Sequence, residues 1–417
     1  MKSNSPSAAR PALFWLLLPF ALGYGASYFF RNVNAVAGPE LAREFSLGPS
    51  GLGFLTSAYF LAFSLAQIPL GMALDRFGPS RVGAVMLTIM SLGAVVFGCA
   101  DDVAALAVGR ALIGLGAGVA LMAVMSAVHL LMPRERAATY IGFAMILGGL
   151  GAMFASTPTQ IAINAYGWRA VFFALSVFAA VVAVYDLWTG RHLPPVAATQ
   201  TFRELAGGVA RIFAAAVFWR ITLATTATLG TMLAFQTLWA ATWMRDVAGF
   251  EDRIAIGNVL FALNLGMTLA FLLGGLIADT LAKRGVAALT TLKAYIALAI
   301  LGQVWLMAVP TFAPHLAWGL FAFGANALTL SFTLLAAQFP PAMTGRVNTS
   351  VNLLAFSSAF ALQWAMGAVL AQWPVTERGY AVQGYYWSWG VLLAVQLVAF
   401  AYLAMPGHRG LRLGAAR

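Results

Sequence analysis

The sequence predicts an all-α membrane protein that crosses the bilayer twelve times. Of its 417 residues, 61% are apolar and only 9% are charged, which is far from the composition of a water-soluble globular domain. Long apolar stretches also follow one another along the chain, and about 20 apolar residues suffice for a helix to cross the hydrocarbon core. The predicted spans are residues 13–36, 50–74, 82–100, 103–131, 137–162, 169–188, 217–243, 254–278, 286–309, 315–337, 347–372 and 384–404.

The charged residues between the spans predict the orientation. With a cytoplasmic amino terminus, seventeen Lys and Arg residues fall on the inner side, and only five fall on the outer side: Arg43, Arg169, Arg245, Arg253 and Arg378. Basic segments remain cytoplasmic. We therefore expect a bacterial inner (plasma) membrane protein with both termini inside and the first span retained. This asymmetry accounts for the net charge of +11, so no nucleic-acid partner is expected.

The longest polar stretch lies in the middle of the chain and suggests two halves. We expect an amino-terminal six-helix bundle at residues 1–188, a cytoplasmic linker at 189–216 and a carboxy-terminal six-helix bundle at 217–417. An internal echo supports this division, because Gly71 precedes Asp75 by the same spacing with which Gly275 precedes Asp279. Paired repeats that enclose a site near the membrane midplane are a transporter plan. The short connections leave no room for a soluble catalytic domain.

The segment from Gly71 to Arg81, GMALDRFGPSR, resembles the signature loop of the major facilitator superfamily. The resemblance extends over nearly the whole chain and implies that family's fold of two pseudo-symmetric six-helix bundles. It also implies a gating role for Gly71, Asp75, Arg76 and Arg81, with Asp279 as the counterpart in the second half. The alternative is that the arginines only anchor a cytoplasmic loop.

Two further segments strengthen the resemblance. Arg110, followed by Gly114, Gly116 and Gly118, resembles the family's fourth-helix motif, and the Tyr166–Arg169 segment resembles the turn into the sixth helix. The antiporter motif of the fifth helix is reproduced poorly, because Pro158 lies too far from the glycines at 148–151. This departure weakens an assignment as a proton-driven drug exporter.

Few ionisable residues fall inside the predicted spans, and such residues are functional candidates because their burial is costly. Arg31 and Arg110 match two cavity arginines of the superfamily's organic-anion branch, although Phe30 stands where that branch places an aspartate. Asp186 is expected near a cytoplasmic end, within reach of water. With no deep carboxylate, two guanidinium groups predict a cationic cavity for a small organic anion, because arginine binds carboxylates in a bidentate way.

Neutral residues in the spans complete the predicted substrate site. These candidates could donate hydrogen bonds or form an apolar wall: Tyr28, Asn34, Tyr59, Gln236, Trp239, Asn264, Asn326 and Asn352. Each has an alternative, since polar side chains also join helices to one another. Arg31 could likewise extend to the outer interface, and Arg110 could bind backbone carbonyl groups at helix ends.

The expected function is secondary active or facilitative transport by alternating access, with coupling and direction left open. The chain is expected to be a monomer in the bilayer that binds a small molecule, to need no cofactor or resident metal, and not to be an enzyme. Met122, Met125, His129 and Met132 share a helical face, and such soft ligands suit Cu(I), so copper transport is one alternative. Drug export and a non-transporting sensor are the others.

Overall fold

The computed structural model describes residues 9–132, 134–193, 202–340, 343–376 and 379–405. Apart from one short hairpin, their regular structure is helical. In chain order the elements are α1 (Ala9–Asn32), α2 (Asn34–Glu44), α3 (Pro49–Phe77), α4 (Pro79–Gly98), α5 (Val103–Ala117), α6 (Ala120–Leu131), α7 (Arg134–Phe154), α8 (Thr157–Gly190), α9 (Phe202–Phe213), α10 (Ala216–Ala234), the π-helix η1 (Phe235–Trp239), α11 (Ala240–Asp246), α12 (Arg253–Lys283), α13 (Ala288–Ala308), α14 (Pro314–Ala325), α15 (Leu328–Ala336), α16 (Thr344–Leu370), β1 (Val375–Thr376), β2 (Gly379–Tyr380) and α17 (Val382–Ala404).

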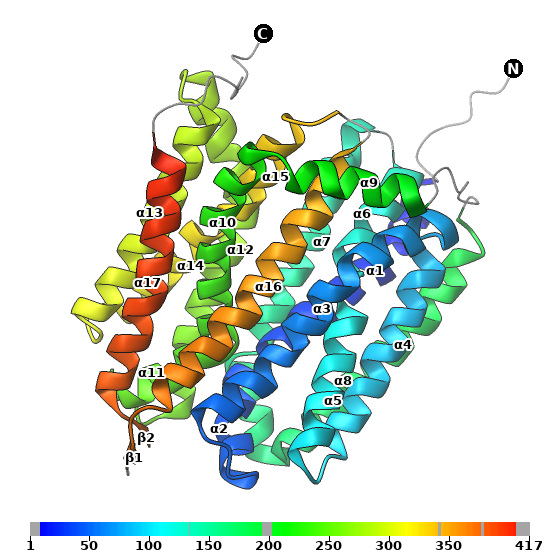
Figure 1. Ribbon diagram of the computed structural model, residues 1–417. Helices are drawn as coiled ribbons and strands as arrows, with labels where there is room; N and C mark the ends of the chain where they lie inside the picture. The colour runs from blue at the N-terminus through cyan, green and yellow to red at the C-terminus, as the bar shows by residue number, and fades with distance from the viewer. Residues whose placement is uncertain (1–8, 133, 194–201, 341–342, 377–378, 406–417) are drawn as a thin grey trace, which may run out of the picture.

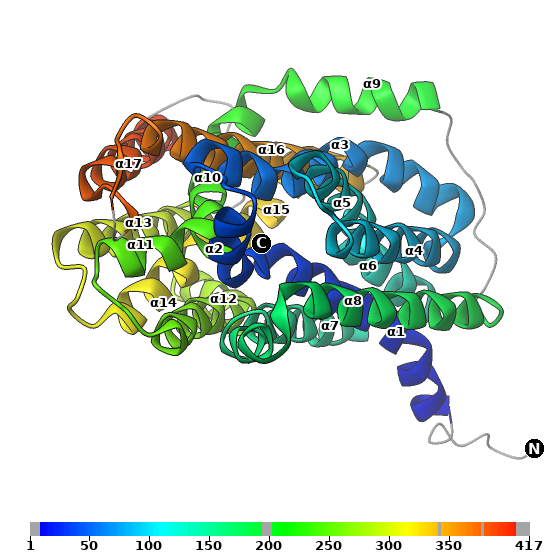
Figure 2. The same ribbon diagram turned by 90° about the horizontal axis from the view of Figure 1, so that it is seen from below.

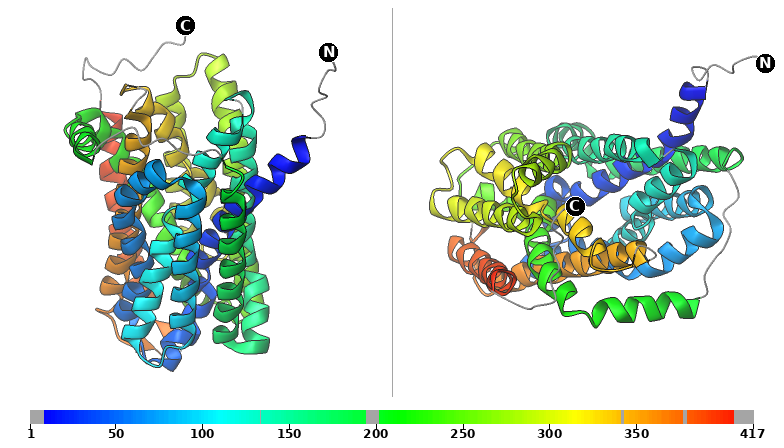
Figure 3. Two further views of the ribbon diagram at one scale, coloured as in Figure 1. Left: turned by 90° about the vertical axis from the view of Figure 1, so that its right-hand side faces the viewer. Right: turned by 90° about the horizontal axis from the view of Figure 1, so that it is seen from above.

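The helices agree with the predicted membrane spans. Eleven helical stretches in the described part of the chain are long and apolar enough to cross a bilayer, and the apolar stretch Thr139–Phe154 of α7 is a shorter one. The helices run side by side from one end of the molecule to the other, and the first turns of α1 project from the bundle (Figure 3). The predicted all-α membrane fold is therefore confirmed.

Five spans in the described part of the chain are interrupted, and four of the interruptions follow a pattern. The first span breaks at Val33, between α1 and α2, and the fourth breaks at Gly118 and Val119, between α5 and α6. The seventh contains η1, and the tenth breaks at Asn326 and Ala327. These four interruptions lie in the first and fourth spans of each successive set of six, whereas the break at Ala155 and Ser156 in the fifth span has no counterpart within α16. Irregular backbone at membrane depth is tolerated where it is buried in protein or lines a cavity.

The turn between the fifth and sixth spans lies inside α8. Gly167 has a φ of +80° there, a conformation that glycine adopts at little cost. The sequence therefore predicts this turn correctly. The residues before Gly167 continue the fifth span after a break at Ala155 and Ser156, and the residues after it form the sixth.

The ends of the bundle carry different elements. The amphipathic helix α9 lies at the end where α1 begins, whereas α2 and the β1–β2 hairpin lie at the opposite end (Figure 1). Seen along the bundle, α9 runs along its outside rather than through its centre (Figure 2). The hairpin pairs Val375 with Tyr380 and Thr376 with Gly379 in antiparallel register.

Small residues let the helices approach closely, as the motif after Arg110 suggests. A Cβ atom on Gly114 would overlap the backbone carbonyl oxygen of Tyr59 in α3, and one on Gly116 would overlap that of Met86 in α4. Close backbone approach at small residues is a general feature of helix packing in membranes. The glycines therefore seat α5 between α3 and α4.

Candidate functional site

A cavity of about 80 Å³ lies inside the bundle, where the interrupted spans meet. It is lined from α5 and α6 on both sides of one break, and from Asn326 and α15 at another. Its lining includes side chains from residues 1–188 and from residues 217–417. The lining consists of Tyr24, Ser27, Tyr28, Arg31, Phe63, Gln67, Ala117, Gly118, Leu121, Met122, Met145, Leu229, Met232, Leu233, Met267, Phe271, Asn326, Leu328, Thr329, Phe332, Asn352 and Phe356.

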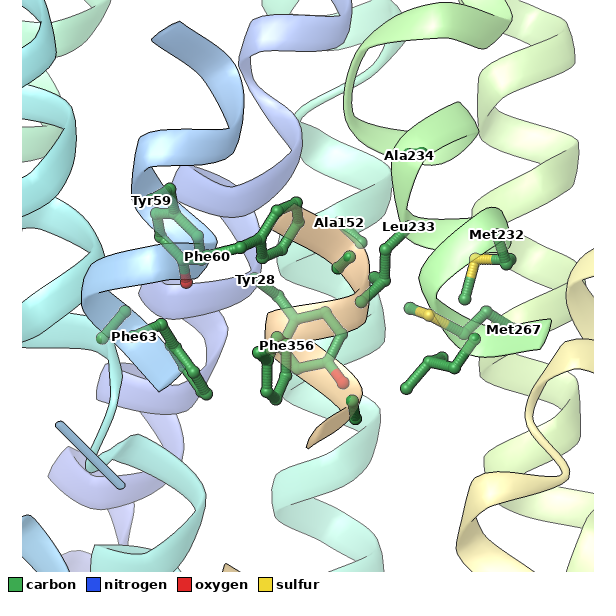
Figure 4. Close-up of a cluster of buried hydrophobic side chains, with 14 of the residues drawn as sticks. Tyr28, Tyr59, Phe60, Phe63, Ala152, Met232, Leu233, Ala234, Met267 and Phe356 are labelled. Atoms are coloured by element: carbon green, nitrogen blue, oxygen red, sulfur yellow. The ribbon is translucent and has the colours of Figure 1, made fainter. Parts of the chain in front are cut away.

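Arg31 is the charged residue of this lining, and aromatic rings surround it. It is 4% exposed, and its guanidinium carbon lies 4.3 Å from the centroid of the Tyr28 ring. The corresponding distances to Phe63 and Phe356 are 5.4 and 4.9 Å. Figure 4 shows these rings gathered between α1, α3 and α16. Ring faces attract a guanidinium group, but they do not neutralise its charge.

Among the described residues, no acidic side chain forms an ion pair that balances this charge. None of the ion pairs among the described residues includes Arg31. Three buried polar atoms that belong to lining residues also have no hydrogen-bond partner: Nε of Arg31, Oε1 of Gln67 and Nδ2 of Asn326. Buried polar groups are almost always paired. The cavity therefore presents one uncompensated cation and several unused hydrogen-bonding atoms.

The predicted residues divide into two groups. Tyr28, Arg31, Asn326 and Asn352 line the cavity together. The prediction missed most of the rest of the lining, but a helical pattern around Arg31 would have identified part of it. Tyr24, Ser27 and Tyr28 precede Arg31 by seven, four and three residues, so all four share one helical face.

Arg110 was expected in the cavity with Arg31, but it does not line the cavity. It is 1% exposed, and its Nη1 donates to the carbonyl oxygen of Phe30 at 2.6 Å while its Nη2 donates to that of Arg31 at 3.2 Å. These carbonyl groups belong to the last turn of α1, which leaves its acceptors without intrahelical partners. The alternative role, in which Arg110 binds carbonyl groups at a helix end, matches this geometry.

Tyr59 and Asn34 join helices. The Tyr59 hydroxyl donates to the carbonyl oxygen of Ser27 at 3.3 Å, and its ring lies 5.1 Å from the guanidinium carbon of Arg110. The Asn34 amide donates to the Thr56 hydroxyl at 3.3 Å. Both side chains are fully buried, so in this structure they connect the first span to its neighbours instead of facing the cavity.

Gln236, Asn264 and Trp239 also bind other helices. Gln236 donates to Asn264 at 2.6 Å, and Asn264 donates to the carbonyl oxygen of Ala152 at 3.0 Å, which connects η1 through α12 to α7. The Trp239 indole donates to the carbonyl oxygen of Gln363 at 3.1 Å. None of the three lines the cavity. The predicted residues that do line it are therefore those around Arg31.

The proposed methionine ladder does not converge on one site. Met122 lines the cavity, whereas Met132 is buried elsewhere and His129 is exposed; Met125 is partly buried outside the lining. Among the described residues, no three His, Cys, Asp or Glu side chains come together as a metal site. Of the four, Met122 alone lines the cavity.

Asp186 differs from its expected position, and the expectation that it reaches water is wrong. It is 1% exposed, and its Oδ1 has no hydrogen-bond partner. The first turn of α4 covers it, because Gly83 leaves space for the carboxyl: a Cβ atom there would lie 2.5 Å from Oδ2. A cavity of about 10 Å³ adjoins it, separate from the one around Arg31.

Contacts at the end that carries α2 join distant parts of the chain. Glu40 of α2 forms an ion pair with Arg253 of α12, and the Thr157 hydroxyl donates to Asn258 at 3.0 Å. These contacts connect residues 1–188 to residues 217–417 at one end of the bundle.

The Tyr166–Arg169 segment contacts Glu44 at the end of α2. The Trp168 indole donates to its carboxylate at 2.8 Å and Arg169 donates at 2.6 Å. Partial burial acts to raise the pKa of Glu44, but these two hydrogen bonds hold it below its usual value. The turn at Gly167 thus places two donors against the end of α2.

A family comparison agrees with this architecture. The family model of the Major Facilitator Superfamily matches residues 20–363. The chain belongs to this superfamily. Its similarity to solved members is structural: a bacterial homolog of the human lysosomal transporter Spinster, crystallised in an inward-facing and unoccupied conformation, aligns with a TM-score of 0.75 at 20% identity, over 94% of this chain and 96% of that one.

Curated relatives within the superfamily differ in their substrates. The probable sulfoacetate transporter SauU of Cupriavidus necator is 26% identical, over 63% of this chain and 64% of its own length. The probable galactarate/D-glucarate transporter GudP of Escherichia coli is 31% identical over 24% of this chain and 22% of its own. The multidrug resistance protein Stp of Mycobacterium tuberculosis is 25% identical over 41% and 33%. The chain thus matches less than two thirds of each relative's length.

The superfamily's signature loop lies at the end of the bundle opposite α2. Arg76 and Arg81 are exposed, and so is Asp279 near the end of α12. Gly71 faces α16, where an added Cβ would make ordinary contact, 3.7 Å from the Thr349 methyl group. The side chain of Asp75 lies outside the described residues. The gating role of these residues stays a prediction.

Proposed function

We propose that this protein is a secondary transporter of a small organic anion, with Arg31 as the group that binds the anion. In this proposal the bundles at residues 1–188 and 217–417 move relative to each other about the central cavity, and the linker at 189–216 joins them. The cavity then opens to one side of the membrane at a time.

One observation carries the proposal: a nearly buried arginine faces the cavity and forms no ion pair within the described residues. An uncompensated charge in a span costs several kcal/mol and marks a functional position. A bound carboxylate or sulfonate would supply the missing negative charge and accept hydrogen bonds from the planar guanidinium group.

The interrupted helices support the same location. Transporters form their sites at discontinuous helices near the midplane, at the interface between repeats. Here the breaks at Gly118 and Asn326 both contribute to the lining of the Arg31 cavity. The corresponding position of the breaks in the two sets of six spans supports the division into related halves.

The Glu40–Arg253 and Thr157–Asn258 contacts suggest which end is closed. We infer that the α2 end faces the outside, because the basic segments and α9 lie at the other end, and that these contacts hold the outer end shut. In this state, the anion would exchange with the cytoplasm. Outward opening would require both contacts to separate.

Thermal stabilisation of the purified protein, followed by flux in proteoliposomes, tests the proposal. A ligand at about a hundred times its dissociation constant adds about 2.7 kcal/mol of stability. We expect organic anions to raise the melting temperature of the wild type and to exchange across the membrane, whereas Arg31→Gln should lose both responses and Arg31→Lys should retain a weaker one. The control Arg191→Gln removes an exposed arginine and should leave both responses unchanged. Equal responses in wild type and Arg31→Gln would refute the proposal.

A further inference from the structure

The described lining of the cavity carries a single charged side chain. Arg31 is the charged side chain in its described lining, so the wall can compensate one negative charge. A second anionic group on the same ligand would be buried against uncharged side chains, at a cost of several kcal/mol. The lining therefore favours a monovalent anion over a dianion.

The polar groups around Arg31 are few, and several of them already bind the protein, although Oε1 of Gln67 and Nδ2 of Asn326 have no partner. Gln67 already donates to the carbonyl oxygens of Phe63 and Gly118. The Thr329 hydroxyl donates to the carbonyl oxygen of Asn326, and the Tyr24 hydroxyl donates to the hydroxyl oxygen of Tyr28. A polyhydroxylated ligand would leave several hydroxyl groups unpaired, and each would cost about 1–3 kcal/mol.

The rest of the wall is apolar and adaptable. Four methionines reach the cavity from four different helices, namely Met122, Met145, Met232 and Met267. Figure 4 shows Met232 and Met267 across the cavity from Phe63, with Tyr28 and Phe356 between. Thioether side chains are flexible and make favourable contacts with aromatic rings. Such a wall suits the apolar body of a ligand whose charged group lies at Arg31.

We infer that the cargo is a monovalent carboxylate or sulfonate with an apolar, ring-sized body, and not a polyhydroxylated diacid. This inference rests on the proposed function, since it assumes that Arg31 binds the anion. The rings of Tyr28, Phe63 and Phe356 around the guanidinium group leave its Nε without a partner. A carboxylate that pairs there places its carbon body against the same rings.

The test compares four probes on the purified wild-type protein by thermal shift and by competition for exchange in proteoliposomes. Phenylacetate is a monovalent anion with a ring, phenylacetamide is its neutral analogue, and glucarate and sulfoacetate are dianions with polar or short bodies. We expect phenylacetate to bind at least about tenfold more tightly than each of the other three. The wild-type ranking needs no variant that might fail to fold.

Matched variants test the two halves of the argument. Met145→Gln makes the wall polar at nearly constant shape and should weaken phenylacetate binding severalfold, whereas Met145→Leu keeps it apolar and should bind as the wild type does. Arg31→Lys should weaken phenylacetate binding and leave phenylacetamide unchanged.

Three other results would contradict the inference, the proposed function or both. If glucarate or sulfoacetate binds as tightly as phenylacetate and depends on Arg31, the inference fails and the proposed anion transport stands. If phenylacetamide binds as well as phenylacetate, the charge does not anchor the ligand, and the inference fails together with the anion proposal. If no organic anion binds or exchanges, the proposed function itself fails.

Discussion

Arg110 donates a hydrogen bond of 2.6 Å from Nη1 to the backbone carbonyl oxygen of Phe30, the residue before Arg31. The guanidinium group thereby binds the end of α1, where helix carbonyl groups carry partial negative charge. Two arginines that the sequence places in one site therefore have different environments. Arg31 faces the cavity, and Arg110 holds the helix end from which Arg31 extends.

Replacing Arg110 with glutamine should destabilise the protein. The change removes two charge-assisted hydrogen bonds and leaves buried carbonyl groups unpaired, so we expect a loss of about 2–4 kcal/mol in the free energy of unfolding. The melting temperature of the purified variant measures this loss, with Arg191→Gln as the exposed control. An unchanged melting temperature together with a lost response to organic anions would instead place Arg110 in the binding site.

Gly114→Ala should also destabilise the protein, because its Cβ would overlap the carbonyl oxygen of Tyr59. Separating α3 from α5 disturbs a tightly packed interface, which typically costs about 1–3 kcal/mol. Gly142→Ala is the matched control, since a Cβ atom at that helical position has open space around it. We expect a lower melting temperature for the first variant only, and similar values for both would refute the packing argument.

Hydropathy predicted the spans well because each must satisfy its backbone as a helix in lipid. It could not predict the breaks within them. The first span was expected at 13–36, yet α1 ends at Asn32 and a second helix follows Val33. Hydropathy is averaged over a whole span of about 20 residues, so it does not reveal a break within the span. The sequence offered backbone carbonyl groups at helix ends as one alternative for Arg110, but this break decides which carbonyl groups they are.

The sequence predicted only part of the candidate site, because it does not show which polar side chains pair with each other. Arg31 could be identified from the sequence, because charged residues are rare inside membrane spans. Side chains such as Gln236 and Asn264 share that polarity, but they pair with each other across 2.6 Å. Sequence shows which side chains can form hydrogen bonds, and only the fold shows which of them are already paired. The apolar wall of methionines was missed because methionine is equally common in packed interiors.

Asp186→Asn should retain or raise stability at neutral pH. The carboxyl is 1% exposed, with Oδ1 unpaired, and a buried charge without a partner costs more than a neutral amide of the same shape. Comparing the melting temperatures of the wild type and of Asp186→Asn at neutral pH tests this prediction. Gly83→Ala should lower it, because the added Cβ would lie 2.5 Å from Oδ2. Strong destabilisation by Asp186→Asn would show that the carboxylate has a partner in the membrane.

Glu44 should make stability depend on acid pH. Its folded pKa lies below its usual value because Trp168 and Arg169 bind the carboxylate, although partial burial opposes them. This stabilisation is present above the unfolded pKa of about 4.3 and is lost as the pH falls through the lower folded value. Glu44→Gln should therefore melt below the wild type at neutral pH, with the difference shrinking as the pH falls below about 4. A difference that stays constant with pH would refute this origin.

The Glu40–Arg253 ion pair should favour closure of the α2 end. It is the charged contact between α2 and α12, with side-chain exposures of 17% and 47%. Exposed pairs are worth up to about 1 kcal/mol, so Arg253→Gln should shift the opening equilibrium by about two- to fivefold. A Thr329→Cys reporter in the cavity lining, with the exposed Cys99 replaced by serine, measures this shift. The reagent is a membrane-impermeant maleimide applied to intact cells.

The neighbouring Arg43 provides the control for this measurement. It pairs with the same carboxylate at 2.6 Å, but it lies three residues from Glu40 on the same helix and has a side chain that is 76% exposed. Arg43→Gln removes an equal charge without releasing α12, so it should leave the labelling rate near that of the parent. We expect faster labelling in Arg253→Gln and in Glu40→Gln only. If Arg43→Gln accelerates labelling as much as they do, the effect comes from surface charge, and the α2 end is not held shut by this pair.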